Sequence, residues 1–261
     1  MQLSVIIPTL NESSSIAGCV KSARELGATE IIVADGGSVD DTGAIADSQD
    51  AQVVAAPPGR GMQMNAGAAA STGDVLLFLH ADNWLPPEAR EQIEQALRDP
   101  AVVHGAFRQR IDAPGRRYRW LEAGNAFRAR QLDTPYGDQA LFVRRTAWEA
   151  IGGFPDQPLM EDVVIARRLR RLGRPALLEG PLHVSARRWQ ENGVLQQTLT
   201  NWGLLAAWMV GVSPGRLASW YNGKPLPPTE VVPAAVEPPP VRSDANNEPL
   251  PPIGVVTQST R

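Results

Sequence analysis

The fold is decided by the stretch LSVIIPTLNE, which occupies residues 3–12. Its first part, Leu3–Ile7, is a short apolar run with β-branched residues, and such runs favour a buried strand. A segment of capping residues follows at Asn11–Ser15, and apolar residues then recur at helical spacing from Ile16 to Leu26. The sequence therefore predicts a strand followed at once by a helix, the first unit of an α/β fold.

The same alternation continues through the first part of the chain. Further strands are predicted at Glu30–Ala34, Gln52–Ala55 and Val75–Leu79, and helices from Asp40 and Asp41 to about Ser48 and over Pro86–Leu97. The run Val75–Leu79 is continuous and apolar, as in strands that are buried on both faces. We therefore expect an α/β protein with a mostly parallel central sheet flanked by helices.

The second half of the chain is less regular. Strands are predicted at Val102–Ile111 and Gln139–Val143, and helices over Arg116–Arg130, after Val143 through Ile151, over Glu161–Leu172 and over Val194–Val210. In the basic helix Arg116–Arg130 we expect Trp120, Leu121 and Phe127 on the apolar side. The Leu- and Trp-rich helix Val194–Val210 is interpreted as core, with contact to a membrane surface as the alternative.

The last segment of the chain, residues 225–261, contains ten prolines and no aromatic residue. A segment of this composition cannot bury enough apolar surface to offset the entropy lost on ordering. We therefore expect a folded domain over residues 1–224 and a Pro-rich disordered tail over residues 225–261.

Composition and charge exclude several classes of protein. The formal net charge of the 261-residue chain is −3, which argues against a nucleic-acid binder. The one cysteine, Cys19, excludes a disulfide framework and a Cys-rich zinc site, and its helical setting predicts a buried thiol. The N-terminus does not resemble a signal peptide, and the longest apolar run, Gly203–Val212, is shorter than the ~18 residues of a membrane-spanning helix. We expect a cytoplasmic protein for which attachment to a membrane surface stays open.

Polar and acidic side chains follow three of the predicted strands. These loops are Thr9–Glu12, Asp35–Ser38 and His80–Asp82. In an open parallel sheet, ligands bind outside the carboxyl ends of the strands, so these loops are the first candidates for a site. The first loop has no GxGxxG pattern, which argues against a dinucleotide enzyme. The segment Gly59-Arg60-Gly61 is predicted to be a mobile loop whose Arg60 meets a phosphate.

Two of these carboxylates have a structural and a functional interpretation. Asp35 either accepts hydrogen bonds from a nucleoside or shapes the turn before two glycines. Asp82 either holds a divalent cation whose other ligands are diphosphate oxygens, or caps the helix that begins near Pro86. Several residues separate Asp82 from that helix, which favours its interpretation as a cation ligand over that as a cap.

Two later clusters also allow two interpretations. Glu161 and Asp162 open a predicted helix, where acidic residues are favoured by the helix dipole, and where a carboxylate is also well placed to act as a general base. The cluster Arg187-Arg188-Trp189 is either a solvated face with one core tryptophan, or a group that neutralises a diphosphate leaving group beside an aromatic pocket wall.

Taken together, these segments resemble the family 2 glycosyltransferases, which have the GT-A fold for nucleotide-diphospho-sugar transfer. The resemblance covers residues 3–224. It is carried by Ser4–Glu12, Val33–Ser38 with Asp40-Asp41-Thr42, Leu76–Asp82, and Gly152-Gly153-Phe154 followed by Glu161-Asp162. The order and spacing of these pieces make the resemblance specific, although each piece is common alone.

The resemblance implies a role for each motif. Thr9, Glu12 and Asp35 would hold the nucleoside, Asp82 would hold Mg²⁺ or Mn²⁺ on the diphosphate, and Asp162 would be the base with Glu161 beside it. Arg188 and Trp189 resemble the end of the family's QxxRW motif on the donor side, but Ser185 stands in place of the Gln, which argues against processive synthesis. His80 replaces the first Asp of the family's DxD motif, which removes a negative charge, and it would ligate the metal or bind the ribose.

A narrower resemblance is to a bacterial subgroup labelled arsenosugar-biosynthesis glycosyltransferases. It is carried by Arg60–Gly67, Phe78–Asp82, Ser185–Trp189 and Tyr136-Gly137-Asp138-Gln139. It places Asp138 and Gln139 near the donor sugar or the acceptor.

The resemblance implies an inverting transfer from a nucleotide-sugar donor, with UDP as the expected nucleotide, to an acceptor hydroxyl on a lipid-linked or small molecule. Two other classes stay open. A sugar-phosphate nucleotidyltransferase would need a Gly-rich, Arg-containing loop after the first strand, which this chain lacks. A non-catalytic nucleotide-binding homologue would have no need of the acidic pair Glu161-Asp162.

Overall fold

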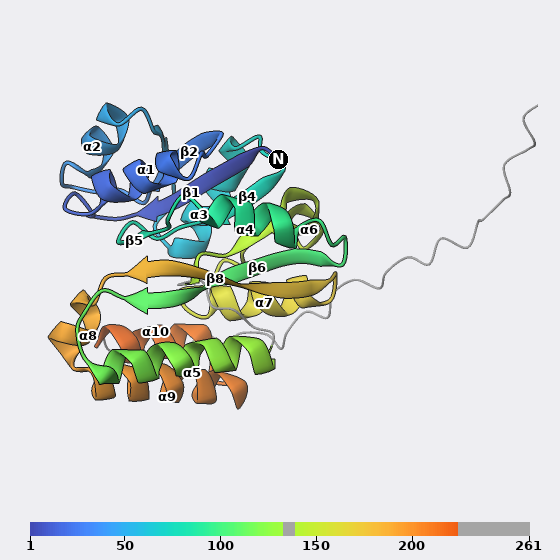
Figure 1. The fold of residues 1–261 in the computed structure, drawn as a ribbon. Helices are drawn as coiled ribbons and strands as arrows, with labels where there is room; N and C mark the ends of the chain where they lie inside the picture. Colours follow the sequence, from blue (N-terminus) through green and yellow to red (C-terminus); the bar gives the residue numbers. More distant parts are fainter. Residues whose placement is uncertain (133–138, 224–261) are drawn as a thin grey trace, which may run out of the picture. The chain divides into compact units, whose positions relative to one another are not determined.

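The computed structural model of the chain describes residues 1–132 and 139–223, except for several side chains in helices, that of Arg188 among them. The strands are β1 (Leu3–Thr9), β2 (Glu30–Asp35), β3 (Gln52–Ala55), β4 (Val75–Phe78), β5 (Asn83–Trp84), β6 (Val102–Ile111), β7 (Phe142–Arg144) and β8 (Arg174–Val184). The helices are α1 (Ile16–Glu25), α2 (Thr42–Ser48), α3 (Arg60–Ala70), α4 (Ala89–Ala96), α5 (Arg116–Leu132), α6 (Arg145–Ala150), α7 (Glu161–Arg170), α8 (Arg187–Asn192), α9 (Val194–Met209) and α10 (Pro214–Asn222) (Figure 1). The tail predicted for residues 225–261 lies outside the described residues and stays a prediction.

The strands of the described part form one sheet in the order β3-β2-β1-β4-β7-β6-β8-β5. The pairings of β1 with β2, β1 with β4, β2 with β3 and β6 with β8 are parallel. The pairings of β4 with β7, β6 with β7 and β5 with β8 are antiparallel. The α/β class is therefore confirmed, and the parallel sheet predicted from the first half of the chain continues into a mixed sheet in the second half.

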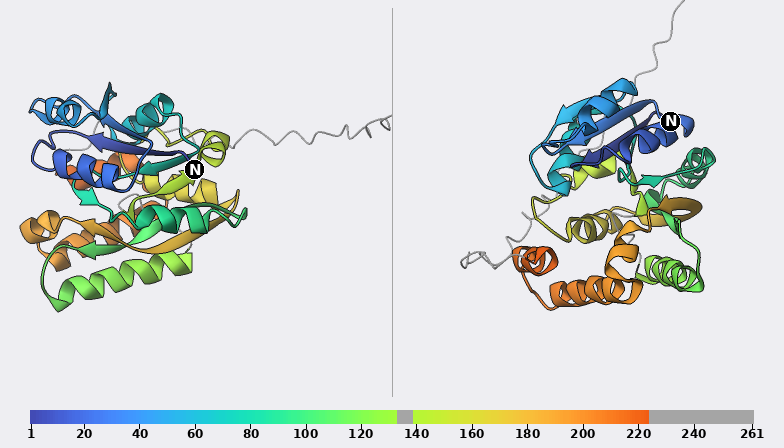
Figure 2. Two further views of the ribbon diagram at one scale, coloured as in Figure 1. Left: turned by 45° about the horizontal axis from the view of Figure 1, so that its top comes forward. Right: turned by 90° about the vertical axis from the view of Figure 1, so that its left-hand side faces the viewer.

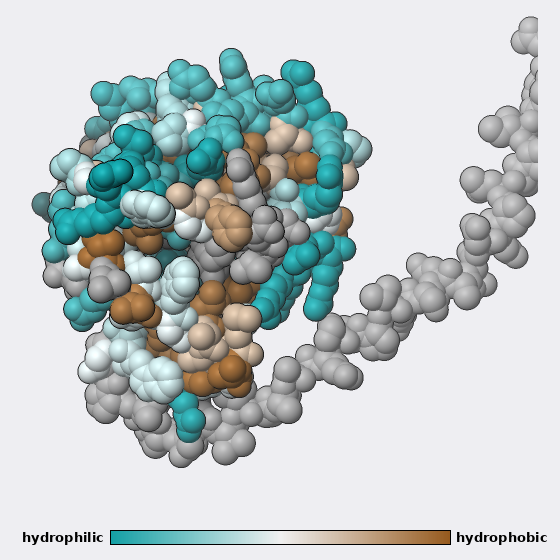
Figure 3. All heavy atoms as spheres, turned by 60° about the horizontal axis from the view of Figure 1, so that its bottom comes forward, coloured by the Kyte–Doolittle hydropathy of each residue, from teal (hydrophilic) through white to brown (hydrophobic). Residues whose placement is uncertain are grey.

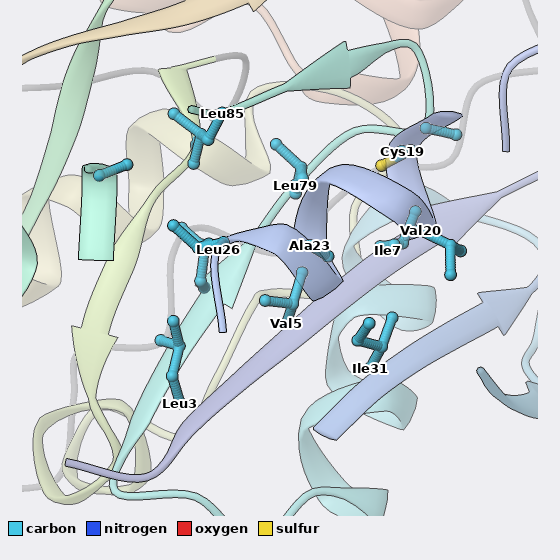
Figure 4. Close-up of a cluster of buried hydrophobic side chains, with 14 of the residues drawn as sticks. Leu3, Val5, Ile7, Cys19, Val20, Ala23, Leu26, Ile31, Leu79 and Leu85 are labelled. Carbon is cyan, nitrogen blue, oxygen red and sulfur yellow. The ribbon is translucent and has the colours of Figure 1, made fainter. Parts of the chain in front are cut away.

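Strand β1 is the centre of this sheet, and all seven of its residues are buried. Leu3, Val5 and Ile7 point to one face, where they meet Val20 and Ala23 of α1 (Figure 4). Ile6 points to the other face and packs with Met64 and Ala68 of α3. Burial of each such side chain stabilises the folded state by about 1.5–3 kcal/mol. Strand β1 therefore contributes to the hydrophobic core on both faces of the sheet.

Helix α3 lies close to this strand because of a glycine. A Cβ atom on Gly67 would come within 2.5 Å of Ile6 Cγ2. The prediction of a mobile loop at Gly59-Arg60-Gly61 is wrong: Arg60 is the first residue of α3, and Gly59, with a φ of +122°, ends the preceding loop. Glycine-rich sequence was misleading here, because the glycines serve close packing and the turn rather than mobility.

Two strand predictions in the second half also need correction. Gln139 is not part of a strand, since β7 begins at Phe142 after Ala140 adopts a left-handed φ of +52°. Strand β8 was not predicted at all, because Pro175, Gly180 and Pro181 interrupt its sequence. It pairs with β6 through two register shifts, which accommodate these residues.

Helices α5, α9 and α10 form a layer beside β6 and β8, with α9 between the other two (Figures 1 and 2). The predicted apolar side of α5 is wrong in part: Tyr118, Ala126 and Ala129 are buried, whereas Trp120 and Phe127 are exposed. The core interpretation of α9 also holds only in part, because Leu204 is buried but Leu199, Trp202 and Met209 are exposed. In the described part of the chain, no helix has both the length and the apolar character needed to cross a bilayer.

His104 is a buried titratable residue within β6. It is fully buried, and neither ring nitrogen has a hydrogen-bond partner among the described residues. Burial lowers the pKa of His104 from 6.5 to about 4, because desolvation disfavours the charged ring. As the pH falls from 6.5 towards 4, the unfolded chain binds a proton here that the folded chain does not, so stability is lost across this window.

We predict that His104→Leu removes this part of the pH dependence. Between pH 7 and pH 4 the wild type should lose about 3 kcal/mol more of its free energy of unfolding than the variant. Urea denaturation at a series of pH values measures the difference. Parallel stability curves for the two proteins would show that His104 does not cause it.

Candidate active site

The loops after β1 and β2 are joined into one unit at the carboxyl edge of the sheet. Thr9 and Asp35 are register partners at the ends of these strands. The backbone N–H of Asn11 donates to Ser38 Oγ at 2.9 Å, and the side chain of Asn11 accepts from the N–H of Val39 at 2.9 Å. The N–H of Glu12 donates to Thr42 Oγ1 at 2.8 Å. The two loops predicted to hold a nucleoside therefore support each other.

Asp35 performs the structural role that the sequence allowed. Its carboxylate accepts a hydrogen bond from Ser38 Oγ at 2.6 Å and another from the Ser38 N–H at 3.1 Å, which shapes the turn. The side chain is only half-buried, so it also faces solvent at the strand end. The nucleoside role and the turn role are compatible in this geometry.

Asp40 is a second carboxylate that holds these loops together. Its hydrogen bond from the Thr42 hydroxyl, with a further one from the N–H of Ser13, lowers the pKa of Asp40 to about 2. Asp40 is therefore ionised at neutral pH and joins the start of α2 to the loop after β1.

Helix α3 reaches the same edge through Gln63. The side-chain amide of Gln63 donates to the carbonyl oxygen of Thr9 at 2.6 Å, and the N–H of Gly36 donates to the same oxygen at 3.0 Å. A Cβ atom on Gly36 would collide with Gln63, so this glycine is required for the contact. Gln63 was not assigned a role from the sequence, and its only signal there was its place in the segment Arg60–Gly67.

Arg60 and Glu161 form an ion pair between the N-termini of α3 and α7. Arg60 Nε donates to Glu161 Oε1 at 2.5 Å; the side chain of Glu161 is 2% exposed and that of Arg60 is 36% exposed. The other oxygen, Glu161 Oε2, is buried without a hydrogen-bond partner among the described residues. Gly61 permits this approach, because a Cβ there would lie only 3.0 Å from the carbonyl oxygen of Pro155.

Asp162 is the accessible member of the acidic pair. It is partly exposed, and its Oδ1 accepts a hydrogen bond from the N–H of Val163 at 2.8 Å in the first turn of α7. The positive end of a helix stabilises an ionised carboxylate at this position. The structure thus separates two adjacent residues that the sequence could not: Glu161 is buried in an ion pair, and Asp162 is partly exposed.

A second group of charged residues surrounds the segment after β4. Cys19 Sγ lies 3.4 Å from the carbonyl oxygen of His80. Burial raises the pKa of the Cys19 thiol, and the nearby carboxylates of Asp82 and Glu12 raise it further. These two carboxylates therefore create a negative field around the segment. Arg187 supplies a positive charge here, with its Nη2 3.8 Å from Glu12 Oε1.

The chemistry of this region suits a hard divalent cation that is shared with a ligand. Asp82 is partly exposed and offers carboxylate oxygens in a negative field. Among the described residues there is no cluster of three His, Cys, Asp or Glu side chains that could hold a metal ion. Mg²⁺ or Mn²⁺ at Asp82 would therefore take its other ligands from diphosphate oxygens and water, as is common for phosphate-bound cations.

The remaining predicted residues are less clearly placed. Trp189, in α8, is partly buried and packs against core residues, as the interpretation of this residue as a core tryptophan predicts. Gln139 is fully buried. Asp138 and the side chain of Arg188 lie outside the described residues. Arg187, which was not assigned individually from the sequence, contacts Glu12 in the loop after β1.

The topology brings the candidates to one edge of the sheet. Asp35 follows β2, and the segment with Asp82 follows β4, which lies on the other side of β1 and is parallel to it. Helix α3 connects to this edge through Gln63, and the ion pair of Arg60 with Glu161 brings in the start of α7 and with it Asp162. Three distant parts of the sequence, each with a candidate acidic residue, are therefore linked to this edge of the sheet.

Comparison with known proteins gives the family. The family model described as glycosyl transferase family 2 matches residues 4–151. A PGL/p-HBAD biosynthesis glycosyltransferase of Mycobacterium bovis is 30% identical over 216 residues, which cover 76% of this chain and 80% of that protein. The probable glycosyltransferase YdaM of Bacillus subtilis is 28% identical over 199 residues, 66% of this chain but only 47% of its own length.

Solved structures give the same fold at lower identity. TarS 1-349 from S. aureus has a TM-score of 0.57 and 16% identity, covering 71% of this chain and 61% of its own. Glucosyl-3-phosphoglycerate synthase from Mycobacterium tuberculosis, in complex with Mn²⁺, UDP and glucosyl-3-phosphoglycerate, has a TM-score of 0.52 and 21% identity, covering 70% of each chain. The chain shares the GT-A fold with these structures, and the family model matches more than half of its residues. The chain therefore belongs to glycosyl transferase family 2.

Proposed function

We propose that the chain transfers a sugar from a nucleoside-diphosphate sugar, UDP-linked, to an acceptor hydroxyl, with inversion at the anomeric carbon and help from a divalent cation. The observation that carries the proposal is the linkage of segments at one edge of the sheet. Asp35 and Asp82 follow parallel strands on either side of β1, and α3 contacts Thr9 through Gln63 and the start of α7 through Arg60. Related folds support it: TarS was solved with UDP-GlcNAc, and glucosyl-3-phosphoglycerate synthase with Mn²⁺ and UDP.

The donor side of the proposed site consists of the loops after β1, β2 and β4. Thr9, Glu12 and Asp35 hold the nucleoside. The carboxylates of Glu12 and Asp35 accept hydrogen bonds from ribose and base, and the buried Thr9 fixes the strand end that carries them. Asp82 holds Mg²⁺ or Mn²⁺. His80 ligates the same cation or binds the ribose of the donor. When bound, the cation stabilises negative charge on the diphosphate oxygens.

Asp162 is the proposed general base. Its carboxylate accepts the proton of the acceptor hydroxyl while the acceptor oxygen forms a bond to the anomeric carbon. The bond from that carbon to the diphosphate oxygen breaks on the opposite face, and the nucleoside diphosphate leaves with the electron pair. Glu161 is not the base, because it is buried and ion-paired with Arg60. It positions the start of α7.

The basic residues of the proposed site act on the leaving group. Arg60 is partly exposed at the edge where the phosphates would lie, and its contact with Glu161 fixes the start of α3. Arg188 and Trp189 follow β8, and we assign them to the donor side, with Asp138 and Gln139 near the donor sugar or acceptor. A guanidinium stabilises the charge that develops on a departing phosphate.

The narrower parts of the proposal concern the subgroup, the acceptor and the location. We propose membership of the bacterial subgroup labelled arsenosugar-biosynthesis glycosyltransferases on the strength of residues 60–67, 78–82 and 185–189. The acceptor is a small or lipid-linked molecule with a free hydroxyl. The cytoplasmic location and the contact with a membrane stay predictions.

The proposal is tested by screening nucleotide sugars for thermal stabilisation, with Mn²⁺ and with EDTA. At about 100 times its Kd a specific donor adds about 2.7 kcal/mol to stability, so the melting temperature should rise by roughly 5–10 °C for a domain of this size. The rise should need both the nucleotide sugar and the cation, and nucleoside monophosphates serve as controls.

A second assay separates the proposal from the other enzyme class. With Mn²⁺ and its best donor, the protein should slowly hydrolyse the nucleotide sugar and release the nucleoside diphosphate. Release of pyrophosphate from a nucleoside triphosphate and a sugar phosphate would instead support a nucleotidyltransferase. A protein that binds a donor but never turns it over, with any acceptor, would be a non-catalytic homologue.

A further inference from the structure

The layer of α5, α9 and α10 exposes large apolar side chains that a buried helix would enclose. The exposed fractions are 77% for Trp120, 65% for Trp202 and 56% for Trp220. Phe127, Leu199, Met209, Val210 and Tyr221 are also exposed. Single exposed apolar residues are common on soluble proteins, but a cluster of this size marks an interaction surface.

These residues gather on one layer. Helix α9 lies between α5 and α10, as the right-hand view of Figure 2 shows. A groove of about 830 Å³ runs between α5 and α9 and is lined by Trp120 and Leu121 on one side and by Val194 and Trp202 on the other. From below, hydrophobic and weakly polar side chains occupy much of the lower half of the surface, whereas strongly hydrophilic ones dominate its upper half (Figure 3).

The net charge of the described side chains of this layer is positive. Helix α9 contains no Asp, Glu, Lys or Arg over its whole length. Helix α5 exposes Arg116 and Arg117, and its one acid, Glu122, is ion-paired with Arg119 at 2.9 Å. Helix α10 adds Arg216 and no acid. A basic, aromatic layer on a chain of net charge −3 indicates a specific anionic partner.

We propose that the outer face of α5, α9 and α10 binds the surface of an anionic lipid bilayer. Tryptophan and tyrosine side chains favour the boundary between headgroups and acyl chains, because one part of the ring is apolar and the other polar. Arginines beside them are attracted by the negative surface potential of anionic lipids. An uncharged helix between them enters the boundary without the cost of desolvating a charge.

A second copy of the chain fits this face less well than a bilayer does. Two identical layers facing each other would bring the arginines of α5 and α10 towards like charges, without acidic partners on the same face. The inference does not depend on which sugar is transferred, because none of these residues belongs to the proposed site.

The test is co-sedimentation of the full chain with vesicles of phosphatidylcholine alone or with added phosphatidylglycerol. We expect binding to the anionic vesicles that weakens as salt is raised. The double variant Trp120→Ser/Trp202→Ser should bind these vesicles at least ~10-fold more weakly. Arg116→Glu should weaken binding to the vesicles with phosphatidylglycerol and leave binding to phosphatidylcholine vesicles unchanged. Leu172→Ser changes an exposed apolar residue outside the layer and should bind like the wild type.

Folding and assembly are checked on the same proteins. Both tryptophans are exposed, so the melting temperature of the double variant should stay close to that of the wild type. Equal vesicle binding by the wild type and the folded double variant would overturn the proposal. So would a wild-type dimer in sedimentation velocity that the double variant converts to a monomer, since the face would then be an interface between copies.

Discussion

Asp162→Asn should lower the rate of sugar transfer by roughly 10²- to 10⁴-fold, the range that a positioned general base contributes. Asparagine keeps the size of the side chain and its hydrogen bond from the N–H of Val163, but it cannot accept a proton at neutral pH. Donor affinity should change little, because the proposed nucleoside site lies in the loops after β1 and β2. Initial rates with a saturating donor, together with donor binding by calorimetry, measure the two quantities separately.

Glu161→Gln is the matched control for this variant. It neutralises the adjacent carboxylate and breaks the buried ion pair with Arg60, so the melting temperature should fall. The acidic limb of the pH–rate profile, which reports the base, should persist in Glu161→Gln and disappear in Asp162→Asn. If Asp162→Asn transfers sugar near the wild-type rate, the base lies elsewhere.

Asp82→Asn should reduce transfer by roughly 10²-fold or more, because the charge on the leaving diphosphate would lose its stabilisation. The variant should also need much more Mn²⁺ to reach half of its own maximal rate. The change removes one negative charge from a region where Asp82 and Glu12 together raise the pKa of Cys19. A titration of activity against Mn²⁺, and UDP binding with and without the cation, measure the effect.

Asp35→Asn is the matched control at the same edge of the sheet. Its side chain is proposed to hold the nucleoside, so the KM for the donor should rise while the Mn²⁺ requirement stays that of the wild type. An unchanged Mn²⁺ titration for Asp82→Asn would exclude Asp82 as the metal ligand.

The first half of the fold could be predicted from the sequence because its information is local. Strands β1 to β4 are short apolar runs, and each is separated from the next by a capped helical pattern or a glycine-rich segment. The second half could not, because β8 contains Pro175, Gly180 and Pro181, and only its pairing with β6 makes it a strand. Tertiary context overrides local pattern there.

The candidate site was predicted in part for a related reason. Acidic residues at strand ends are visible in the sequence, and Asp35 and Asp82 were proposed on this ground. The pair of Arg60 with Glu161 joins residues far apart in the chain, and no periodicity predicts such a contact. The same holds for Gln63 and Arg187, whose partners are Thr9 at the end of β1 and Glu12 in the loop after it.

Helix α5 shows why the buried side of a helix could not be predicted from the sequence. Spacing predicts which residues share a face of a helix, but it assumes that the apolar face points inward. Helix α5 instead buries Tyr118 and two alanines, and turns Trp120 and Phe127 outward. Of the three residues predicted to share the apolar side, only Leu121 packs against core residues.

The long connection between β5 and β8 has a consequence for biosynthesis. Asn83 and Trp84, directly after Asp82, pair with Val184 and His183, which leave the ribosome about a hundred residues later. Contacts of such high contact order form late, since a large loop must close before they are made. A nascent chain can thus pair β1 with β2 early, whereas the segment beside Asp82 gains its neighbouring strand only after β8 has been synthesised.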